Sequence, residues 1–100
     1  MNQSELVSLL QRGTSALRAG DFGDAERCYR NVLSAEPRNF DALHFLGIVR
    51  ARVGRNEEAA SLIAAALRQR PGAADALSNL ANVLIGMGRY EEALELGGRP

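Results

Sequence analysis

Apolar residues recur along this chain every three or four positions, with polar residues filling the positions between them. In one such stretch Phe22, Ala25 and Tyr29 fall on one side of a helix, whereas Glu26 and Arg30 fall away from it. This spacing matches the turn of an α helix and not the two-residue alternation of a strand. It predicts an all-α chain with six helices, at about residues 4–19, 22–35, 39–53 and 56–69, one starting near residue 75 and a short one starting at residue 90.

Polar residues stand where several of these helices begin. Ser4, Asp21 and Asn39 can each accept a hydrogen bond from a free amide of the first turn and are the expected N-caps. Asp75 lies near the start of the fifth helix, where the helix dipole favours a negative charge.

Glycine marks a repeat of the whole pattern. Gly20, Gly54 and Gly88 recur at a constant interval of about 34 residues, and a fixed period of this length is typical of a repeat array. Each is followed five positions later by an alanine. Each glycine can take the left-handed conformation that closes a helix, and Pro37 and Pro71 prevent the next helix from continuing. We expect one domain over residues 1–100, with repeat 1 at about 6–39, repeat 2 at about 40–73, a truncated repeat 3 at about 74–96 and a tail at 97–100.

Small residues at matching positions predict close contact between the two helices of each unit. Gly13 and Gly47 lie in the middle of predicted helices, where glycine costs about 0.5 to 1 kcal/mol relative to alanine. Such a cost is reasonable where a neighbouring helix comes very close. The expected neighbours are Ala25 for Gly13 and Ala59 for Gly47.

The period and these residues resemble the tetratricopeptide repeat (TPR). In the middle unit the resemblance rests on Leu43, Leu46, Gly47, Ala59 and Pro71. It implies helix-turn-helix units stacked as a short right-handed α-solenoid of about two and a half TPR units. The chain departs from the pattern at Arg12, which stands where later units have leucine, and in its shortened third unit.

Composition narrows the classes of function. The chain has 12 basic and 12 acidic residues, so no net charge attracts nucleic acid or an anionic membrane surface. A single cysteine cannot form an internal disulfide framework, and no apolar run has the length of a membrane span. We therefore expect no nucleic-acid partner, no membrane partner and a cytoplasmic location.

Candidates for catalysis are few. Asp41 and His44 are three residues apart on a predicted helix and could form an acid/base pair. The alternative is a polar surface contact, which we favour because no second histidine or nucleophile completes a site. Cys28 is expected to be a packing residue. We expect no enzyme activity, no cofactor and no metal site.

The resemblance implies that the first helix of each unit lines a concave groove. The residues at those positions form a mixed apolar and polar surface that could receive an amphipathic helix or an extended peptide. They are Val7, Leu10, Thr14, Leu17, Arg18, Asp41, His44, Ile48, Ala51, Arg52, Asp75, Ser78, Asn79, Asn82 and Ile85.

Two known versions of the family differ in how they hold a client. One grips a terminal carboxylate through Lys, Asn and Arg residues, and Leu10, Thr14 and Phe45 do not fit that set. Asn79 and Asn82 look instead like the groove asparagines of arrays that precede glycosyltransferase domains. Only one unit carries both residues.

Three hypotheses for function follow. The first is a non-catalytic scaffold that binds another protein or peptide in its groove. The second is the substrate-recruiting segment of a larger bacterial glycosyltransferase or sulfotransferase. The third is a homo-oligomerisation module that forms a homodimer through the C-terminal repeat, where Leu80, Val83 and Leu84 have only a short helix to cover them.

Overall fold

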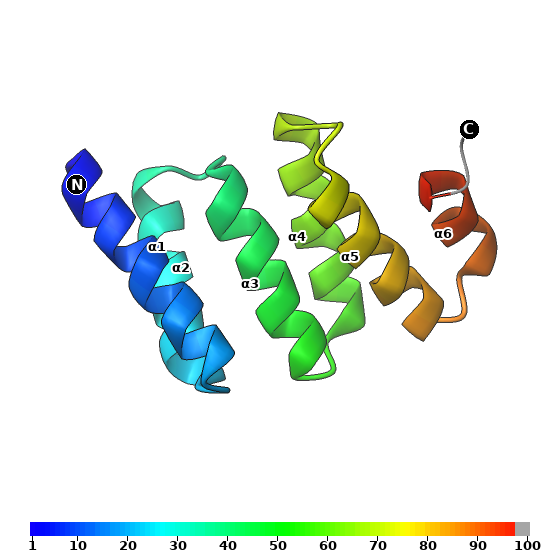
Figure 1. Cartoon of the computed structure of the whole chain (residues 1–100), viewed down its shortest axis with the longest axis horizontal. Coiled ribbons are helices and arrows are strands. Elements are labelled where there is room, and N and C mark those ends of the chain that lie inside the picture. The colour runs from blue at the N-terminus through cyan, green and yellow to red at the C-terminus, as the bar shows by residue number, and fades with distance from the viewer. Residues whose placement is uncertain (98–100) are drawn as a thin grey trace.

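Six helices follow one another in the computed structural model, which describes residues 1–97 (Figure 1). No strand occurs in this range, which confirms the predicted all-α class. The helices are α1 (Gln3–Arg18), α2 (Phe22–Ala35), α3 (Phe40–Arg52), α4 (Asn56–Gln69), α5 (Ala74–Gly86) and α6 (Tyr90–Gly97).

Glycine closes the first helix of each pair in the same way. Gly20, Gly54 and Gly88 have φ values of 79°, 84° and 76°, which a residue without a Cβ adopts at little cost. The amide after each glycine bonds back to a carbonyl five residues earlier, as in a Schellman motif. Each of these three bonds measures 2.8 Å, and they join Asp21 to Ala16, Arg55 to Arg50 and Arg89 to Leu84. The glycine signal in the sequence is confirmed at all three turns.

The helix starts confirm two of the three predicted caps. Asp21 accepts from the Asp24 amide at 3.1 Å, and Asn39 accepts from the Ala42 amide at 2.9 Å. The prediction for Ser4 was wrong. Asn2 is the cap of α1, where a reciprocal capping box with Glu5 satisfies two amides and starts the helix earlier than expected.

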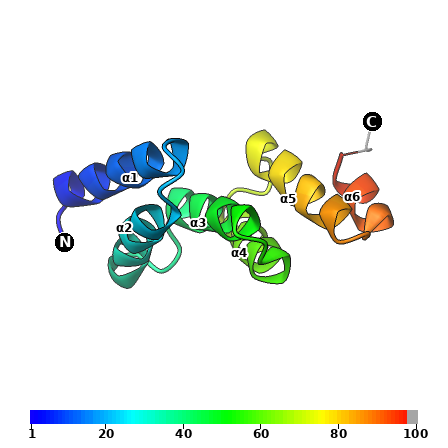
Figure 2. The same ribbon diagram turned by 90° about the horizontal axis from the view of Figure 1, so that it is seen from below.

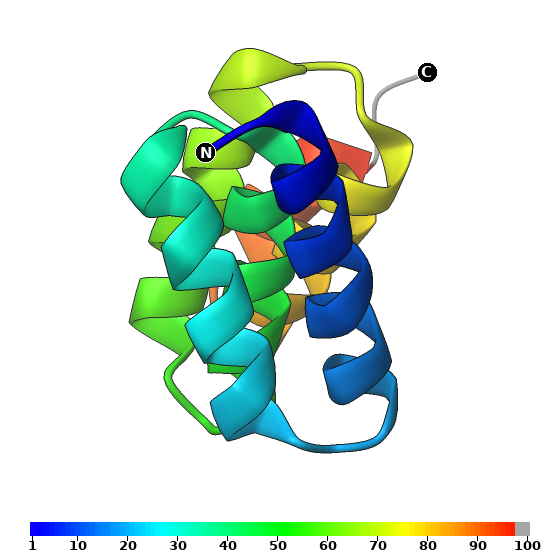
Figure 3. The same ribbon diagram turned by 90° about the vertical axis from the view of Figure 1, so that its left-hand side faces the viewer.

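The helices form two layers along an elongated molecule of 40 × 24 × 18 Å. Consecutive helices pair as α1 with α2, α3 with α4 and α5 with α6, and each pair contacts the next. Figure 3 shows the first pair, with α1 and α2 lying antiparallel. In Figure 2, α1 and α5 rise on either side of α3, which leaves a concave side lined by the odd-numbered helices. This is the stacked solenoid that the sequence predicts.

Apolar side chains form two core clusters, one for each junction between pairs. Tyr29 and Leu46 lie in the first cluster, and Ile63 and Leu80 lie in the second. Tyr29 and Ile63 occupy the same position in successive repeats, and both are fully buried. The same register therefore supplies the centre of each cluster with a large side chain.

The two mid-helix glycines do meet a neighbouring helix closely, but the main partner differs from the prediction. A Cβ built on Gly13 would lie 2.8 Å from the Tyr29 ring, and one on Gly47 would lie 2.6 Å from Ile63 Cγ1. The Ala59 carbonyl oxygen is also near Gly47, at 3.2 Å, as expected. The glycines thus make room chiefly for the large residue one helical turn beyond each expected alanine.

The departure at Arg12 has a structural explanation. Its side chain lies on the outer side of α1 and is 64% exposed, whereas Leu46 at the matching position is 2% exposed. Its guanidinium holds Asp24 of α2 through two hydrogen bonds, the shorter of 2.7 Å. These bonds to Arg12 lower the pKa of Asp24 below its ordinary value. Arg12 therefore ties α1 to α2 by charge where later pairs use apolar contact.

Candidate functional site

The concave side of the solenoid is the candidate site, and three helices contribute to it (Figure 2). The side chains that were expected there differ in how much surface they present. Those that are exposed are Val7, Arg18, Arg52, Asp75, Ser78, Asn82 and Ile85. Those that are partly buried are Leu10, Thr14, Leu17, Asp41, Ile48, Ala51 and Asn79.

Charged residues lie at the two ends of the helices on the concave side. Arg18 and Arg52 end α1 and α3, and Asp41 and Asp75 lie in the first turns of α3 and α5. Because these three helices run in a similar direction (Figure 1), the two arginines lie at one end of them and the two aspartates at the other. Along α3, Asp41 and Arg52 are about 16 Å apart, at about 1.5 Å per residue. Ile48 lies between them.

Thr14 connects the groove to the core. Its hydroxyl donates to the Leu10 carbonyl at 2.9 Å and lies 3.2 Å from the Tyr29 hydroxyl. The Tyr29 ring stacks on Phe45 at a centroid distance of 5.8 Å. Burial raises the pKa of Tyr29, so the phenol stays protonated in this contact. The polar atom of Thr14 is therefore largely engaged within the chain.

His44 occupies a different place from the one expected. Its side chain is 5% exposed, and its Nε2 lies 2.8 Å from the Asn79 side-chain nitrogen. The prediction of a surface contact between His44 and Asp41 was wrong, because the histidine is buried and its partner is in α5. Since the amide nitrogen of Asn79 is a donor, Nε2 accepts the bond and the ring is neutral. Two residues expected to contact a ligand thus join the second pair of helices to the third.

Comparison with known proteins gives the family. The family model described as "Tetratricopeptide repeat" matches residues 10–74 and again residues 46–98. The chain belongs to the tetratricopeptide repeat family. These overlapping matches cover most of the array and agree with the regular spacing of its glycine turns.

Two similar proteins are matched over only a part of their own length. Cellulose synthase 2 operon protein C of Komagataeibacter xylinus is 38% identical over 69 residues, which are 69% of this chain and 5% of that protein. A mutant of the Thermobaculum terrenum O-GlcNAc transferase matches 98% of this chain with 34% identity and a TM-score of 0.88, over 21% of its own length. The tetratricopeptide array described here thus spans a small part of both relatives.

A third similar structure shares the fold at low identity. The second TPR of Spaghetti, bound to an HSP90 peptide, has a TM-score of 0.86 and 18% identity over 92% of this chain and 85% of that one. This likeness concerns the arrangement of helices alone.

Other chemistry on the array is limited. Cys28 is 2% exposed, and burial raises its pKa, so the thiol is a packing residue of α2. Over residues 1–97, no three His, Cys, Asp or Glu side chains gather where they could hold a metal ion. Within that same range no helix combines the length and the hydropathy of a membrane span.

The buried His44 makes the stability of the array depend on pH. Burial lowers the pKa of His44 below its ordinary value of 6.5, an effect that Asp75 and Asp41 partly oppose. Between the folded and the unfolded pKa the unfolded chain binds more protons, so stability falls as pH drops below about 6.5. Protonation also removes the acceptor used by Asn79.

We expect urea unfolding to give full stability above about pH 6.5 and decreasing stability toward about pH 5. His44 is the only histidine in the chain, so His44→Gln should remove this slope. An unchanged slope in that variant would assign the pH dependence to other groups.

Proposed function

We propose that this chain is a non-catalytic scaffold that binds a segment of another protein across its concave groove. The observation that carries the proposal is the polarity of the groove, with Arg18 and Arg52 at one end of its helices and Asp41 and Asp75 at the other. Preformed grooves on helical arrays suit either an amphipathic helix or an extended peptide.

The arrangement of charge specifies the chemistry of the client. The client we propose has apolar side chains that lie over Ile48. Its acidic groups lie toward the two arginines, and its basic groups lie toward the two aspartates. Electrostatic complementarity of this kind fixes the register and orientation of a bound segment more than it raises affinity. Asp41 and Arg52 lie about 16 Å apart along α3, which leaves room between them for a helix with its side chains, about 10 to 12 Å across.

Recognition of a terminal carboxylate does not suit this groove. Leu10 is partly buried, and the hydroxyl of Thr14 already donates to the Leu10 carbonyl. The client we propose is therefore held along its length.

We expect Arg52→Glu to weaken client binding by about tenfold, because a reversed rim charge repels the acidic side of the client. Peptides selected against the unmodified chain from a random library supply the probe, and fluorescence anisotropy supplies the affinity.

Arg68→Glu is the matched control. Arg68 is exposed in the last turn of α4, as Arg52 is in α3, but lies outside the groove. Equal affinities of the Arg52→Glu and Arg68→Glu chains for every selected peptide would contradict binding in the groove.

A second candidate is the substrate-recruiting segment of a larger enzyme. Its support is the likeness to the O-GlcNAc transferase structure, at 34% identity over nearly all of this chain. An antibody raised against the array tests it in the source organism. A native band far above the 10.8 kDa of this chain favours this candidate, and a band at that mass opposes it.

A third candidate is self-association through the C-terminal repeat. The expectation that Leu80, Val83 and Leu84 lack cover was wrong, because they are 8%, 8% and 5% exposed and lie in the second core cluster. Two side chains of α6 are exposed instead. Tyr90 and Leu94, one turn apart on α6, are 65% and 70% exposed. Two large apolar side chains on one stripe favour contact with another apolar surface. Light scattering over a concentration series distinguishes a monomer from the homodimer that this candidate requires.

A further inference from the structure

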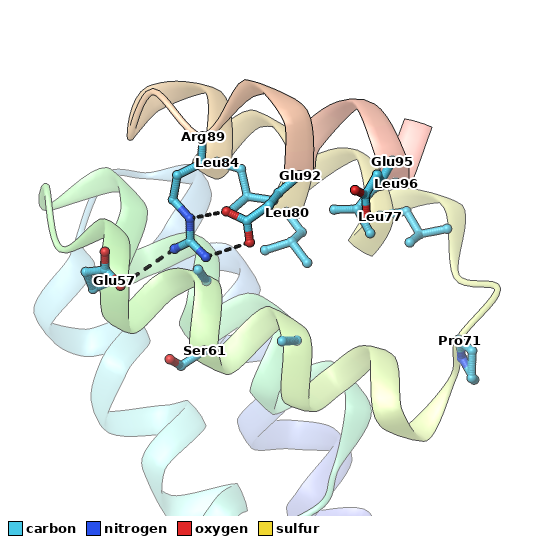
Figure 4. A pocket seen from close by; sticks show the side chains of 12 residues that line it. Glu57, Ser61, Pro71, Leu77, Leu80, Leu84, Arg89, Glu92, Glu95 and Leu96 are labelled. Atoms are coloured by element: carbon cyan, nitrogen blue, oxygen red, sulfur yellow. Dashed lines mark hydrogen bonds and ion pairs between the residues drawn. The ribbon is translucent and has the colours of Figure 1, made fainter. Parts of the chain in front are cut away.

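A hollow of about 800 Å³ lies between α4, α5 and α6 (Figure 4). None of the residues expected in the concave groove lines it. Its floor is apolar, with Leu77, Leu80 and Leu84 of α5, and small residues Ala60 and Ala64 form the α4 wall. Its volume is typical of a ligand site in proteins, about 300 to 1,000 Å³.

The equivalent gap between α2 and α4 shows what normally fills this position. There Arg50 of α3 reaches between the two helices and is only 12% exposed. Its Nη2 donates to Glu26 at 2.8 Å. Its Nε lies 3.2 Å from Glu58, within ion-pair distance but outside hydrogen-bond geometry. A hollow of about 430 Å³ remains in that gap.

The register of the repeat explains why the second gap stays open. The positions of Glu26, Arg30 and Arg50 are taken there by Ala60, Ala64 and Leu84. The bridge that Arg50 makes across the first gap is therefore missing from the second, where Arg89 at the start of α6 pairs with Glu57 of α4 instead. Two alanine side chains and an apolar floor stand in its place.

The rim of the hollow carries an excess of negative charge. Three carboxylates line it, those of Glu57, Glu92 and Glu95, with one guanidinium, that of Arg89. Arg89 pairs with Glu57 at 3.8 Å and donates to Glu92 at 2.7 Å. Glu95 has no ion-pair partner among residues 1–97. Among the described residues that line the hollow, three carboxylates and one cation give a net charge of −2.

We propose that this hollow binds an apolar, arginine-bearing segment of a partner protein. An aliphatic side chain of the partner contacts Leu80 and Leu84, and its guanidinium pairs with Glu95, the lining carboxylate that Arg89 does not hold. Arginine suits both parts of the site, because its stem covers apolar surface while its planar head pairs with carboxylates. This surface is separate from the concave groove and is independent of the function proposed above.

Two fluorescein-labelled pentapeptides test the charge preference with the full chain. One alternates leucine and arginine, and the other alternates leucine and glutamate. Fluorescence anisotropy should show the arginine peptide binding at least about tenfold more tightly, with the difference decreasing as salt is added. Equal affinities for the two peptides would overturn the proposal.

Ala64→Arg tests the location. It copies Arg30 of the first gap, fills part of the hollow and adds a cation, so we expect at least about a tenfold loss of arginine-peptide affinity. The matched control is Ser34→Arg, an exposed α2 position outside the hollow, which should bind as the unmodified chain does. An Ala64→Arg chain that keeps both its helicity and its affinity would place the peptide elsewhere and overturn the proposal.

Glu95→Lys is a second variant that tests the same site. It places no new side chain in the α4 wall, so the result does not depend on whether α4 accepts an arginine there. Glu95 is exposed, so its reversal should leave the fold intact and weaken binding of the arginine peptide severalfold. Unchanged affinity in Glu95→Lys would count against the rim as the source of charge recognition.

Discussion

Replacing Leu46 with aspartate should unfold the array. Leu46 is 2% exposed in the first core cluster, and a carboxylate there would lose its hydration without gaining a partner. We expect a loss of about 4 kcal/mol or more, which approaches the whole stability of a typical small domain. Far-ultraviolet circular dichroism at room temperature should show most of the helical signal gone.

Leu94→Asp is the control for this result. It makes the same chemical change on α6 at a side chain that is 70% exposed, so full helicity should remain. A Leu46→Asp chain with a full helical signal and an unchanged melting temperature would contradict the core described here.

Gly47→Leu should be the next most damaging change. Even the first carbon of a new side chain would lie 2.6 Å from Ile63 Cγ1 and 3.2 Å from the Ala59 carbonyl oxygen. Overpacking of this kind costs about 3 kcal/mol when the backbone cannot move away. For a domain of this size each kcal/mol lowers the melting temperature by about 4 to 8 °C, so the shift should be obvious in a thermal melt.

A compensating change and a control sharpen this experiment. Ile63→Ala in the Gly47→Leu background should recover part of the loss, since contacting residues are coupled. Gly72→Leu should have little effect, because no atom lies within 4 Å of the position a Cβ would take there. Failure of Ile63→Ala to recover any stability would show that the two residues are not in direct contact.

Most of the fold could be predicted because local signals repeat. The three glycines that need a positive φ recur at a constant interval, and helix periodicity fills the stretches between them. In the middle unit Gly54 closes the first helix with its positive φ, and Pro71 stands just after the end of the second. The prediction that Ser4 caps the first helix was wrong because Asn2 and Glu5 together make two capping hydrogen bonds, more than a single serine supplies.

The close contacts of the glycines were harder to assign. Helical spacing identified which positions need room but not which side chain occupies it. One signal was present in the sequence, because Tyr29 follows Gly13 at the same interval at which Ile63 follows Gly47. In the third unit Ala81 replaces the glycine, and Gly97 stands at that interval after it. Where the first position of the pair is glycine the second is a large residue, and where the first is alanine the second is glycine.

The burial of His44 could not be read from its position in the unit. The matching residues, Leu10 and Ser78, are both more exposed. His44 is covered because Asn79, one residue out of register, reaches it from α5. Such a contact depends on the distance between neighbouring pairs of helices, which the repeat period does not give. The hollow beside α6 was missed for a related reason, since it arises from three substitutions spread over two units.

The cellular location and the client of this array stay predictions. Its surface has three regions that experiments can distinguish: the concave groove, the hollow between α4, α5 and α6, and the apolar stripe of Tyr90 and Leu94 on α6. A binding partner found by any method can be assigned to one of them by the residues it affects.

Chemical-shift mapping of the isotopically labelled chain with a selected client peptide tests binding in the concave groove. We expect the perturbed amides to lie on α1, α3 and α5, around Arg18, Ile48 and Arg52. Perturbations confined to α4 and α6, or to the stripe of Tyr90 and Leu94, would contradict binding in the concave groove.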